Sequence, residues 1–394
     1  IIFGFIFTFF SSFGQSFFLG LFNAPIRNEL NISHGQFGTF YATSTICSSL
    51  LLIYVGKKID EFKLYNYSFF VITLLFISSI FFSFINNVYL LVVGIFLMRF
   101  SGQGLMSHTS STAISRYFEK SRGKALSTVW LGLSTAEFIL PVLVIYFLSI
   151  YSWKIVWQGI SFLIILTLPL VIYFTIKKIN LESREDGLAF KSSVKIKNWK
   201  RKEVLKDYRF YIISLNMLAV PWIFTGIAVY QSFISDSKIW DVYTIPKAFM
   251  VYSITSIITL FMSGFLVDKF TGRKLILYMN LPLLLAMFTL FKFNHEISAY
   301  VFLGLIGVSN GLANILGSST WAEIYGVKYI GSIKALTTAF MVFSTAFGTA
   351  VFGLLIDNGF SIENIAFVGG AYIVISLALL VIFRKTIEPV KLAN

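Results

Sequence analysis

The sequence predicts an all-α membrane protein with twelve transmembrane helices in two pseudo-symmetric halves of six. Of its 394 residues, 57% are hydrophobic and only 13% are charged, whereas soluble proteins are roughly 45–50% apolar and about 25% charged. Apolar segments of about 20 residues, the length that a helix needs to cross a hydrocarbon core, recur along the whole chain. The basic residues collect in every second gap between these segments. Lipid is therefore the expected solvent for most of the chain.

Each predicted helix is an apolar segment bounded by charged or turn-forming residues. In order, the twelve segments cover roughly 1–23, 35–55, 65–85, 88–115, 124–150, 155–177, 209–234, 244–267, 275–292, 297–322, 330–356 and 363–384. The longest gap is rich in lysine and divides the helices six and six. We therefore expect an N-terminal half over 1–177, a basic cytoplasmic linker over 178–208 that lies on anionic headgroups, and a C-terminal half over 209–394.

The distribution of lysine and arginine sets the predicted orientation in the membrane. The loops after the second, fourth, sixth, eighth and tenth helices and the C-terminal tail hold 3, 4, 11, 3, 2 and 3 of these residues. The loops on the other side hold only Arg27, Lys154, Lys238, Lys247 and Lys292. Short cytoplasmic loops carry the excess of basic residues, so both termini are predicted to be cytoplasmic. The net charge of +14 follows from this topology and indicates no nucleic-acid partner.

The start of the chain and its cysteine content suit a bacterial inner membrane. The chain begins inside an apolar segment with neither an initiator methionine nor a basic leader, so we expect a short N-terminal piece to precede it. The first apolar stretch is longer than a typical signal-peptide core, so we expect no cleavable signal peptide. The single cysteine, Cys47, permits no intrachain disulfide.

Two loops on the predicted cytoplasmic side carry the same spacing of glycine and aspartate. The loop after the second helix has Gly56 and Asp60, and the loop after the eighth helix has Gly264 and Asp268, each 208 positions after its counterpart. Internal structural repeats are a common feature of transporter folds. The repeat therefore indicates two halves of related structure.

With these loops the chain resembles the major facilitator superfamily, whose loop between helices 2 and 3 carries Gly-x-x-x-Asp-Arg-x-Gly-Arg-Lys and whose loop between helices 8 and 9 often repeats it. The first copy departs from this pattern, because Glu61 replaces the usual basic residue and Lys63 replaces the second glycine. The resemblance implies a cytoplasmic gate to which Asp60, Asp268 and Arg273 contribute.

Two further segments support this resemblance. The run Arg99-Phe-Ser-Gly-Gln103-Gly104 is similar to the family's Arg-x-x-x-Gln-Gly element in helix 4. Residues 115–125 resemble the loop between helices 4 and 5 of members related to the oxalate/formate and monocarboxylate carriers. The resemblance implies a secondary active transporter that works by alternating access, with a small, monocarboxylate-like organic anion as its substrate.

Two ionisable residues lie at the predicted depth of the bilayer centre. Arg99 lies 17 residues before Arg116, and Glu137 lies 13 residues after Lys124, which places them about 25 and about 20 Å from the cytoplasmic ends of their helices. Charges at this depth are costly and mark functional sites by default. We expect Arg99 and Glu137 to face the cavity and to form or exchange an ion pair that couples transport to protons. The alternative is a permanent buried pair that only joins two helices.

The resemblance also implies that helices 1, 4, 7 and 10 line the central cavity. Polar residues on these helices then become candidates for substrate binding: Gln15, Arg99, Gln103, Trp222, Tyr230, Asn310 and Asn314. Arg99 and Gln103 are one turn apart on one helix face, and so are Asn310 and Asn314. Each of these side chains could instead make an interhelical hydrogen bond.

Two alternative functions have to be compared with an anion carrier. A carrier of the same fold could import or export a neutral or amphiphilic solute. A membrane-embedded, lipid-processing enzyme would need His, Asp or Ser residues clustered at one membrane face, and the sequence has no such cluster, so no enzyme is predicted. Three scattered histidines and one cysteine indicate no metal site. Nothing requires a cofactor, and a monomer is expected.

Overall fold

The computed structural model describes residues 1–117, 122–177, 197–326 and 329–388, and within these ranges it contains helices and turns but no β-strand. The first helices in the chain are α1 (Ile2–Ser11), η1 (Ser12–Gly14), α2 (Ser16–Leu19), η2 (Gly20–Phe22), α3 (Asn23–Leu30), α4 (His34–Gly56), η3 (Lys57–Asp60), α5 (Leu64–Phe82), α6 (Val88–Met98), η4 (Arg99–Met106), α7 (Ser107–Tyr117), α8 (Arg122–Leu148), α9 (Trp153–Ile172) and η5 (Tyr173–Lys177). The later helices are α10 (Arg201–Val204), α11 (Tyr208–Val229), α12 (Gln231–Lys238), α13 (Thr244–Phe270), α14 (Gly272–Leu275), α15 (Leu281–Lys292), α16 (Ile297–Tyr325), α17 (Ile330–Asp357) and α18 (Ile362–Phe383).

The lengths of these helices agree with the predicted membrane fold. Among the described residues, 10 helices are long and apolar enough to cross a membrane, and the pair Ile2–Gly14 and Ser16–Leu30, bent by 43°, makes up to 11. The remaining predicted segment contains the shorter apolar helix α15, of 12 residues. The fold class is thereby confirmed as an all-α membrane protein, with one bent span and one short one.

Polar side chains fix the starts of several membrane helices. Ser33 and Gln36 form a reciprocal capping box at α4, in which the Ser33 hydroxyl accepts from the Gln36 amide and the Gln36 side chain accepts from the Ser33 amide. Asn87 caps α6, Ser152 caps α9 and Ser361 caps α18, each through a side-chain oxygen that accepts from one backbone amide of the first turn. Each cap satisfies a backbone N–H that has no partner within the helix.

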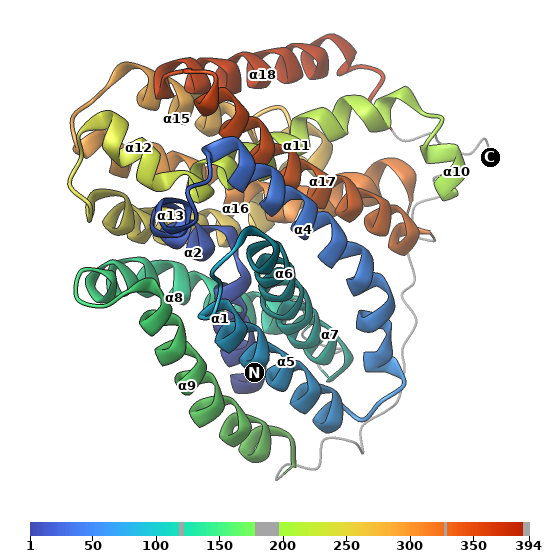
Figure 1. The fold of residues 1–394 in the computed structure, drawn as a ribbon. Helices are drawn as coiled ribbons and strands as arrows, with labels where there is room; N and C mark the ends of the chain where they lie inside the picture. The colour runs from blue at the N-terminus through green and yellow to red at the C-terminus, as the bar shows by residue number, and fades with distance from the viewer. Residues whose placement is uncertain (118–121, 178–196, 327–328, 389–394) are drawn as a thin grey trace. The chain divides into compact units, whose positions relative to one another are not determined.

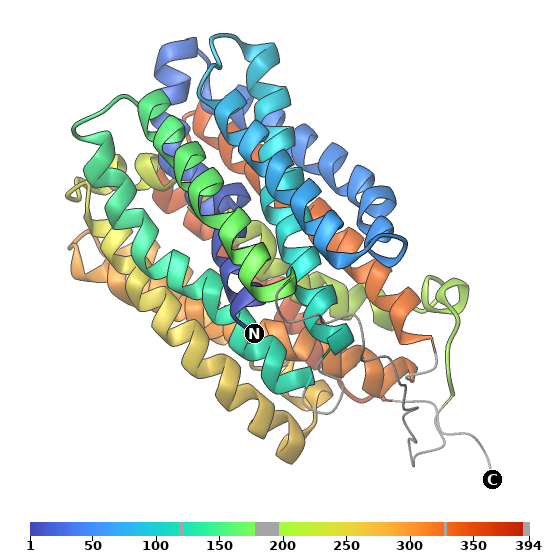
Figure 2. The same cartoon turned by 90° about the horizontal axis from the view of Figure 1, so that it is seen from below.

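The chain forms two compact units. Unit 1 comprises residues 1–187, 227–233 and 349–357, and unit 2 comprises 188–226, 234–348 and 358–394. Within unit 1, α1 packs against α8, α4 against α6, and α5 against α9, a pair that runs side by side in Figures 1 and 2. Within unit 2, α13 packs against α16, while α15 packs against both α16 and α18. The last turns of α11 and α17 belong to unit 1.

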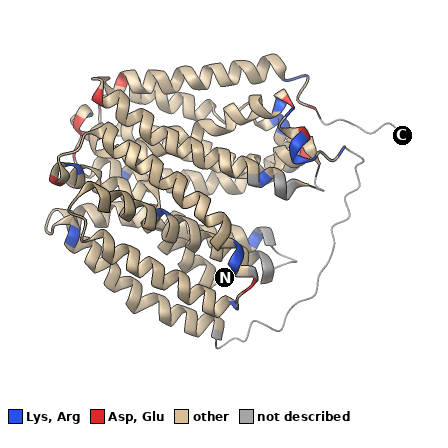
Figure 3. Ribbon diagram, turned by 45° about the vertical axis from the view of Figure 1, so that its right-hand side comes forward, with Lys and Arg blue, Asp and Glu red and all other residues tan. Residues whose placement is uncertain are grey.

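The outer faces of the helices are apolar and the charges lie mostly at helix ends. In Figure 3 the helix bodies are almost entirely tan, and the blue and red residues gather at the turns. Large apolar side chains such as Phe265 (78% exposed) and Ile382 (70% exposed) lie on the surface of the protein. A water-soluble protein rarely exposes so many large apolar groups, whereas lipid is a good solvent for them.

Candidate substrate site

The first membrane span is broken near its middle. The α-helix ends at Ser11, a 3₁₀ turn follows to Gly14, and Gln15 is extended, with φ −82° and ψ 154°, before helix resumes at Ser16. A break of this kind frees backbone groups from their helical partners, and at membrane depth other protein groups must satisfy them. The prediction of one continuous helix over 1–23 was therefore wrong in its middle.

The guanidinium group of Arg99 contacts the chain at this break. Its Nη1 donates to the carbonyl oxygen of Gly14 at 3.1 Å and lies 3.2 Å from the hydroxyl of Ser16. The guanidinium carbon lies 5.3 Å from the centre of the Tyr41 ring, and the Tyr41 hydroxyl donates to Ser16 at 3.0 Å. Arg99 is only 2% exposed. A buried guanidinium thus stabilises the free carbonyl at the end of the first half-helix.

The segment that follows Arg99 packs directly on the break. Residues Arg99–Met106 form a π-helical stretch, a geometry that occurs often at functional sites. A side chain at Gly14 would overlap the backbone of Met98 and Gln103, and one at Gly102 would overlap the backbone of Gly14. Gly14 and Gly102 therefore allow the two backbones to approach closely.

Arg99 and Glu137 do not form an ion pair with each other in this structure. Among the described residues, no carboxylate forms an ion pair with Arg99, and Glu137 on α8, which is 8% exposed, has neither a hydrogen bond nor an ion pair. The same unit therefore contains two buried residues of opposite charge, each without an oppositely charged partner in the described part of the chain. Their predicted role in proton coupling stays a prediction.

Two of the other predicted substrate-binding residues lie at the break. Gln15 is the extended residue of the break and is half-buried, and Gln103 is half-buried in the adjoining π-helical stretch. The structure thus brings both of them to the same place as Arg99, in the first unit. Whether they bind substrate stays a prediction.

The remaining four predicted substrate-binding residues are divided between the two units. Tyr230 belongs to unit 1, where its hydroxyl is within hydrogen-bond distance of the carbonyl oxygens of His34 (2.9 Å) and Thr349 (3.0 Å). The other three belong to unit 2. There the Trp222 ring packs 6.0 Å from Phe347 and 5.3 Å from Tyr372, the Asn310 amide donates to Ser256 at 3.1 Å, and Asn314 is exposed. Tyr230 and Asn310 thus make hydrogen bonds between helices, which is the alternative to substrate binding that the sequence left open.

A contact that the sequence did not reveal holds the start of α4. The Asp357 carboxylate, at the end of α17, accepts from the Ser33 hydroxyl at 2.5 Å and from the amides of His34 and Gly35 at 3.0 and 2.8 Å. An acidic group at a helix N-terminus is favourable because the free amides there carry partial positive charge. The capping box could be predicted from Ser33 and Gln36, but nothing local predicts a partner 324 residues away.

The predicted gating residues are only partly described. The side chains of Asp60 and Asp268 lie outside the described residues. Arg273, on the short α14, has its Nη1 3.4 Å from the Glu388 carboxylate. The backbone amides of Gly272 and Arg273 donate to Glu323, near the end of α16, at 2.7 and 3.0 Å. The second copy of the repeated loop is therefore joined to α16 and to the segment after α18.

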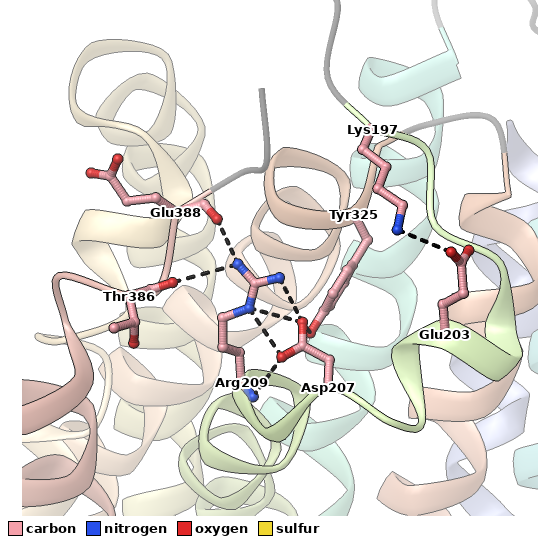
Figure 4. Close-up of polar contacts among 7 residues, drawn as sticks. All are labelled: Lys197, Glu203, Asp207, Arg209, Tyr325, Thr386 and Glu388. Carbon is pink, nitrogen blue, oxygen red and sulfur yellow. Dashed lines mark hydrogen bonds and ion pairs between the residues drawn. The ribbon is translucent and has the colours of Figure 1, made fainter. Parts of the chain in front are cut away.

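A second buried network, also missed by the sequence, lies at the start of α11 (Figure 4). Arg209 Nε lies 2.8 Å from one carboxylate oxygen of Asp207 and its Nη2 lies 2.7 Å from the same oxygen. Its Nη1 donates to the carbonyl oxygens of Thr386 and Glu388 at 3.5 and 2.7 Å. The Tyr325 hydroxyl donates to Asp207 at 3.2 Å. The network thus joins the start of α11, the end of α16 and the segment after α18.

Exposed residues beside this network form a single ion pair. Lys197 forms an ion pair with Glu203 at 3.0 Å. The Lys200 backbone amide, which also donates to Glu203, and the Lys197 ammonium together lower the pKa of this carboxyl. The sequence predicted that this region is part of a basic linker. Its described part belongs to unit 2, where the Trp199 amide donates to the carbonyl oxygen of Tyr325 at the end of α16.

Comparison with solved structures places this fold among transporters. A bacterial homolog of the human lysosomal transporter Spinster, in an inward-facing and occupied conformation, superposes with a TM-score of 0.73, 15% identity and coverage of 98% of this chain and 96% of that one. The nucleoside transporter NupG gives 0.72, with 12% identity and 97% and 98% coverage. A D-xylose-proton symporter gives 0.71, with 14% identity and 98% and 96% coverage.

Comparison of sequences gives the family. No curated protein matches the chain, but residues 4–245 match the family described as Major Facilitator Superfamily. This match covers more than half of the chain and includes both the broken first span and Arg99. The solved structures resemble the chain over nearly its whole length, and their titles describe transporters. The chain therefore belongs to the major facilitator superfamily, and it is a transporter rather than an enzyme.

Proposed function

We propose that this transporter is a secondary active carrier that moves a small, monocarboxylate-like organic anion by alternating access, with Arg99 in its substrate site. The observation that carries the proposal is the buried Arg99 guanidinium, for which the described residues supply no carboxylate partner. An uncompensated charge away from water costs several kcal/mol. A bound carboxylate offsets that cost, so the site should bind an anion in preference to a neutral solute.

We also propose that a proton travels with the anion. Glu137 is buried in the same unit and has no basic partner among the described residues. A proton neutralises this carboxyl in the same way that an anion neutralises Arg99. Loading both at once removes both buried charges, and this favours symport over movement of either species alone. A D-xylose-proton symporter is among the solved structures of similar fold.

The distribution of charge supports a proposal for the membrane in which the carrier lies and for its orientation there. We infer that it is a monomer in a bacterial inner membrane with both termini in the cytoplasm. The support is that basic residues concentrate in alternate loops and in the 178–208 segment, as expected where cytoplasmic loops face anionic headgroups. We also propose that residues 1–177 and 209–394 are the N-terminal and C-terminal halves of the carrier.

A thermal-shift screen of the detergent-purified protein tests the substrate class. The panel contains small carboxylates, sugars, nucleosides, amino acids and organic cations, and the screen is repeated with Arg99→Lys, which keeps the charge but loses the planar fork of donors. We expect a carboxylate to stabilise the wild-type protein, by about 2.7 kcal/mol at 100 times its Kd, and to stabilise the variant much less. Arg201→Lys, at an exposed position, is the matched control and should behave as wild type.

A proteoliposome assay tests proton coupling separately. With an imposed pH gradient, Glu137→Gln should still exchange the anion across the membrane but should no longer accumulate it. Glu61→Gln, at an exposed position, is the matched control. Concentrative uptake with unchanged pH dependence in Glu137→Gln would remove Glu137 from the proposal while leaving the substrate class untouched.

A neutral solute is the second candidate, and one observation favours it. The Nη1 of Arg99 already donates to Gly14 and lies beside Ser16, so part of the guanidinium is used to hold the helix break. Solved structures of similar fold include a nucleoside transporter and a D-xylose-proton symporter. Stabilisation in the same screen only by neutral or cationic compounds, unchanged by Arg99→Lys, would select this candidate and end the anion proposal.

A further inference from the structure

A basic pocket lies between α14 and the segment that follows α18. Its volume is about 230 Å³, and both of its walls belong to unit 2. Arg273 and Lys274 line one wall, and Arg384 and Lys385 line the other. Lys274, Arg384 and Lys385 are exposed. All four residues lie on the face that the distribution of basic residues predicts to be cytoplasmic.

Partly buried hydrogen bonds hold both walls in place. On one side, the Glu323 carboxylate accepts from the amides of Gly272 and Arg273. On the other side, Arg209, itself only 8% exposed, donates to the carbonyl oxygens of Thr386 and Glu388 (Figure 4). The basic side chains are therefore attached to a fixed backbone rather than to free chain ends.

The charge of this pocket is strongly unbalanced. Glu388 is the single acidic residue among those that line it, and its carboxylate lies 3.4 Å from Arg273. The Glu388 side chain is 65% exposed, so this ion pair is weak. Lys274, Arg384 and Lys385 form no ion pair with the described residues. The pocket therefore offers several cationic donors to an anion with more than one oxygen.

Apolar groups line the pocket between its basic residues, and the neighbouring helices carry exposed apolar side chains. Ile276, Leu277 and Ile387 line it between the basic residues. The neighbouring helices α15 and α18 pack against each other, and both carry exposed apolar side chains at their pocket ends, with Leu281 at the start of α15 and Ile382 near the end of α18. A basic pocket beside helices with exposed apolar side chains suits a lipid at the membrane interface.

We propose that this pocket binds the phosphate headgroup of an anionic phospholipid from the cytoplasmic leaflet, with the acyl chains along α15 and α18. Basic pockets between membrane helices on the cytoplasmic side attract anionic headgroups. Arginine donates to phosphate oxygens in a planar fork, and lysine adds point charges. The ligand neutralises Lys274, Arg384 and Lys385, and it bridges the two walls of the pocket.

Native mass spectrometry of the full chain in detergent tests the proposal directly. The probes are phosphatidylglycerol, phosphatidylcholine with the same acyl chains, and glycerol 3-phosphate as a soluble phosphate. We expect phosphatidylglycerol to bind more tightly than phosphatidylcholine. The double variant Arg384→Gln/Lys385→Gln should weaken phosphatidylglycerol binding by about 30-fold, since each basic residue near an anionic surface contributes on the order of a factor of five.

Two further variants make the test specific for the pocket. Arg201→Gln/Lys202→Gln removes an exposed Arg-Lys pair elsewhere in unit 2, and it should change binding less than twofold. Glu388→Gln removes the acidic side chain of the pocket but keeps the carbonyl that accepts from Arg209, and it should tighten binding several-fold. All four exchanged basic residues are exposed, so the variants should fold as the wild type does.

Three outcomes would overturn the proposal. If the Arg201/Lys202 pair matters as much as the Arg384/Lys385 pair, general surface charge and not the pocket attracts the lipid. If phosphatidylcholine binds as tightly as phosphatidylglycerol, the basic residues do not recognise a net anionic headgroup. If glycerol 3-phosphate binds equally well and with the same dependence on Arg384 and Lys385, the ligand is a soluble phosphate and not a lipid.

Discussion

Arg209 and Lys197 lie near each other in unit 2 but form ion pairs of different kinds (Figure 4). In the Arg209–Asp207 pair the side chains are 10% and 5% exposed, whereas in the Lys197–Glu203 pair they are 38% and 41% exposed. Removing one partner of a buried pair leaves an uncompensated charge. Water solvates the remaining partner of an exposed pair at little cost.

Arg209→Ala should therefore be far more damaging than Lys197→Gln. We expect Arg209→Ala to destabilise the protein by about 3–5 kcal/mol, and Arg209→Lys to recover only part of this because it cannot reach Asp207 and the Glu388 carbonyl with one planar group. Lys197→Gln should change stability by less than about 1 kcal/mol. Thermal unfolding in one detergent measures all three, and equal losses for Arg209→Ala and Lys197→Gln would contradict the assignment.

A second prediction for a single residue concerns Asp357. Its carboxylate accepts from the Ser33 hydroxyl and from two amides at the start of α4. Asp357→Asn keeps the shape but loses the charge, so it should lower stability by about 0.5–1 kcal/mol at low ionic strength and by less at high salt. Asp236→Asn, at an exposed position on α12, is the control. No change of melting temperature in Asp357→Asn at either salt concentration would show that the contact contributes nothing.

Among the helices, the broken first span is the element that shapes the candidate site. The break at Gln15 frees the Gly14 carbonyl, Arg99 satisfies it, and the glycine of the next segment, Gly102, lets the two backbones meet. Each part depends on the others, since a continuous helix at this position would leave the buried guanidinium without its acceptor. A substrate that reaches Arg99 would thus contact a site whose geometry the break sets.

Gly14→Ala tests this packing. The added methyl group would overlap the Met98 carbonyl and the Gln103 amide, which are backbone atoms that cannot move aside, so we expect a loss of about 1–3 kcal/mol or more. Gly159→Ala on α9 is the matched control, because nothing lies within 4 Å of the new methyl group. It should be neutral or stabilising by up to about 1 kcal/mol. Similar melting temperatures for the two variants would mean that the close approach at Gly14 is not required.

For the whole molecule, the distribution of basic residues predicts the orientation in the membrane. A green fluorescent protein fused to the C-terminus should fluoresce, because this protein folds in the cytoplasm. An alkaline phosphatase fused after Phe293, between α15 and α16, should be active, because that enzyme needs the oxidising side. The reverse pattern would overturn the assignment of both termini to the cytoplasm and would place the proposed lipid pocket in the other leaflet.

The sequence by itself determined the class of fold. Apolar segments of membrane-spanning length and alternating basic loops depend on local composition, because every stretch of chain meets the bilayer separately. The capping box of Ser33 and Gln36 is equally local. The resemblance carried by Arg99 and Gln103 led to the right superfamily. These two residues lie with Gln15 at the break of the first span, and their role in substrate binding stays a prediction.

Only the tertiary structure decided how the buried polar groups are satisfied. Arg99 was expected to pair with Glu137, but it donates to a carbonyl that becomes free when the first span breaks. Asp357 lies 324 residues from the hydroxyl that it accepts from, and Arg209 donates to a carbonyl 179 residues away. A buried donor takes whichever acceptor the packing brings near. That choice depends on contacts between distant segments, which no local pattern in the sequence contains.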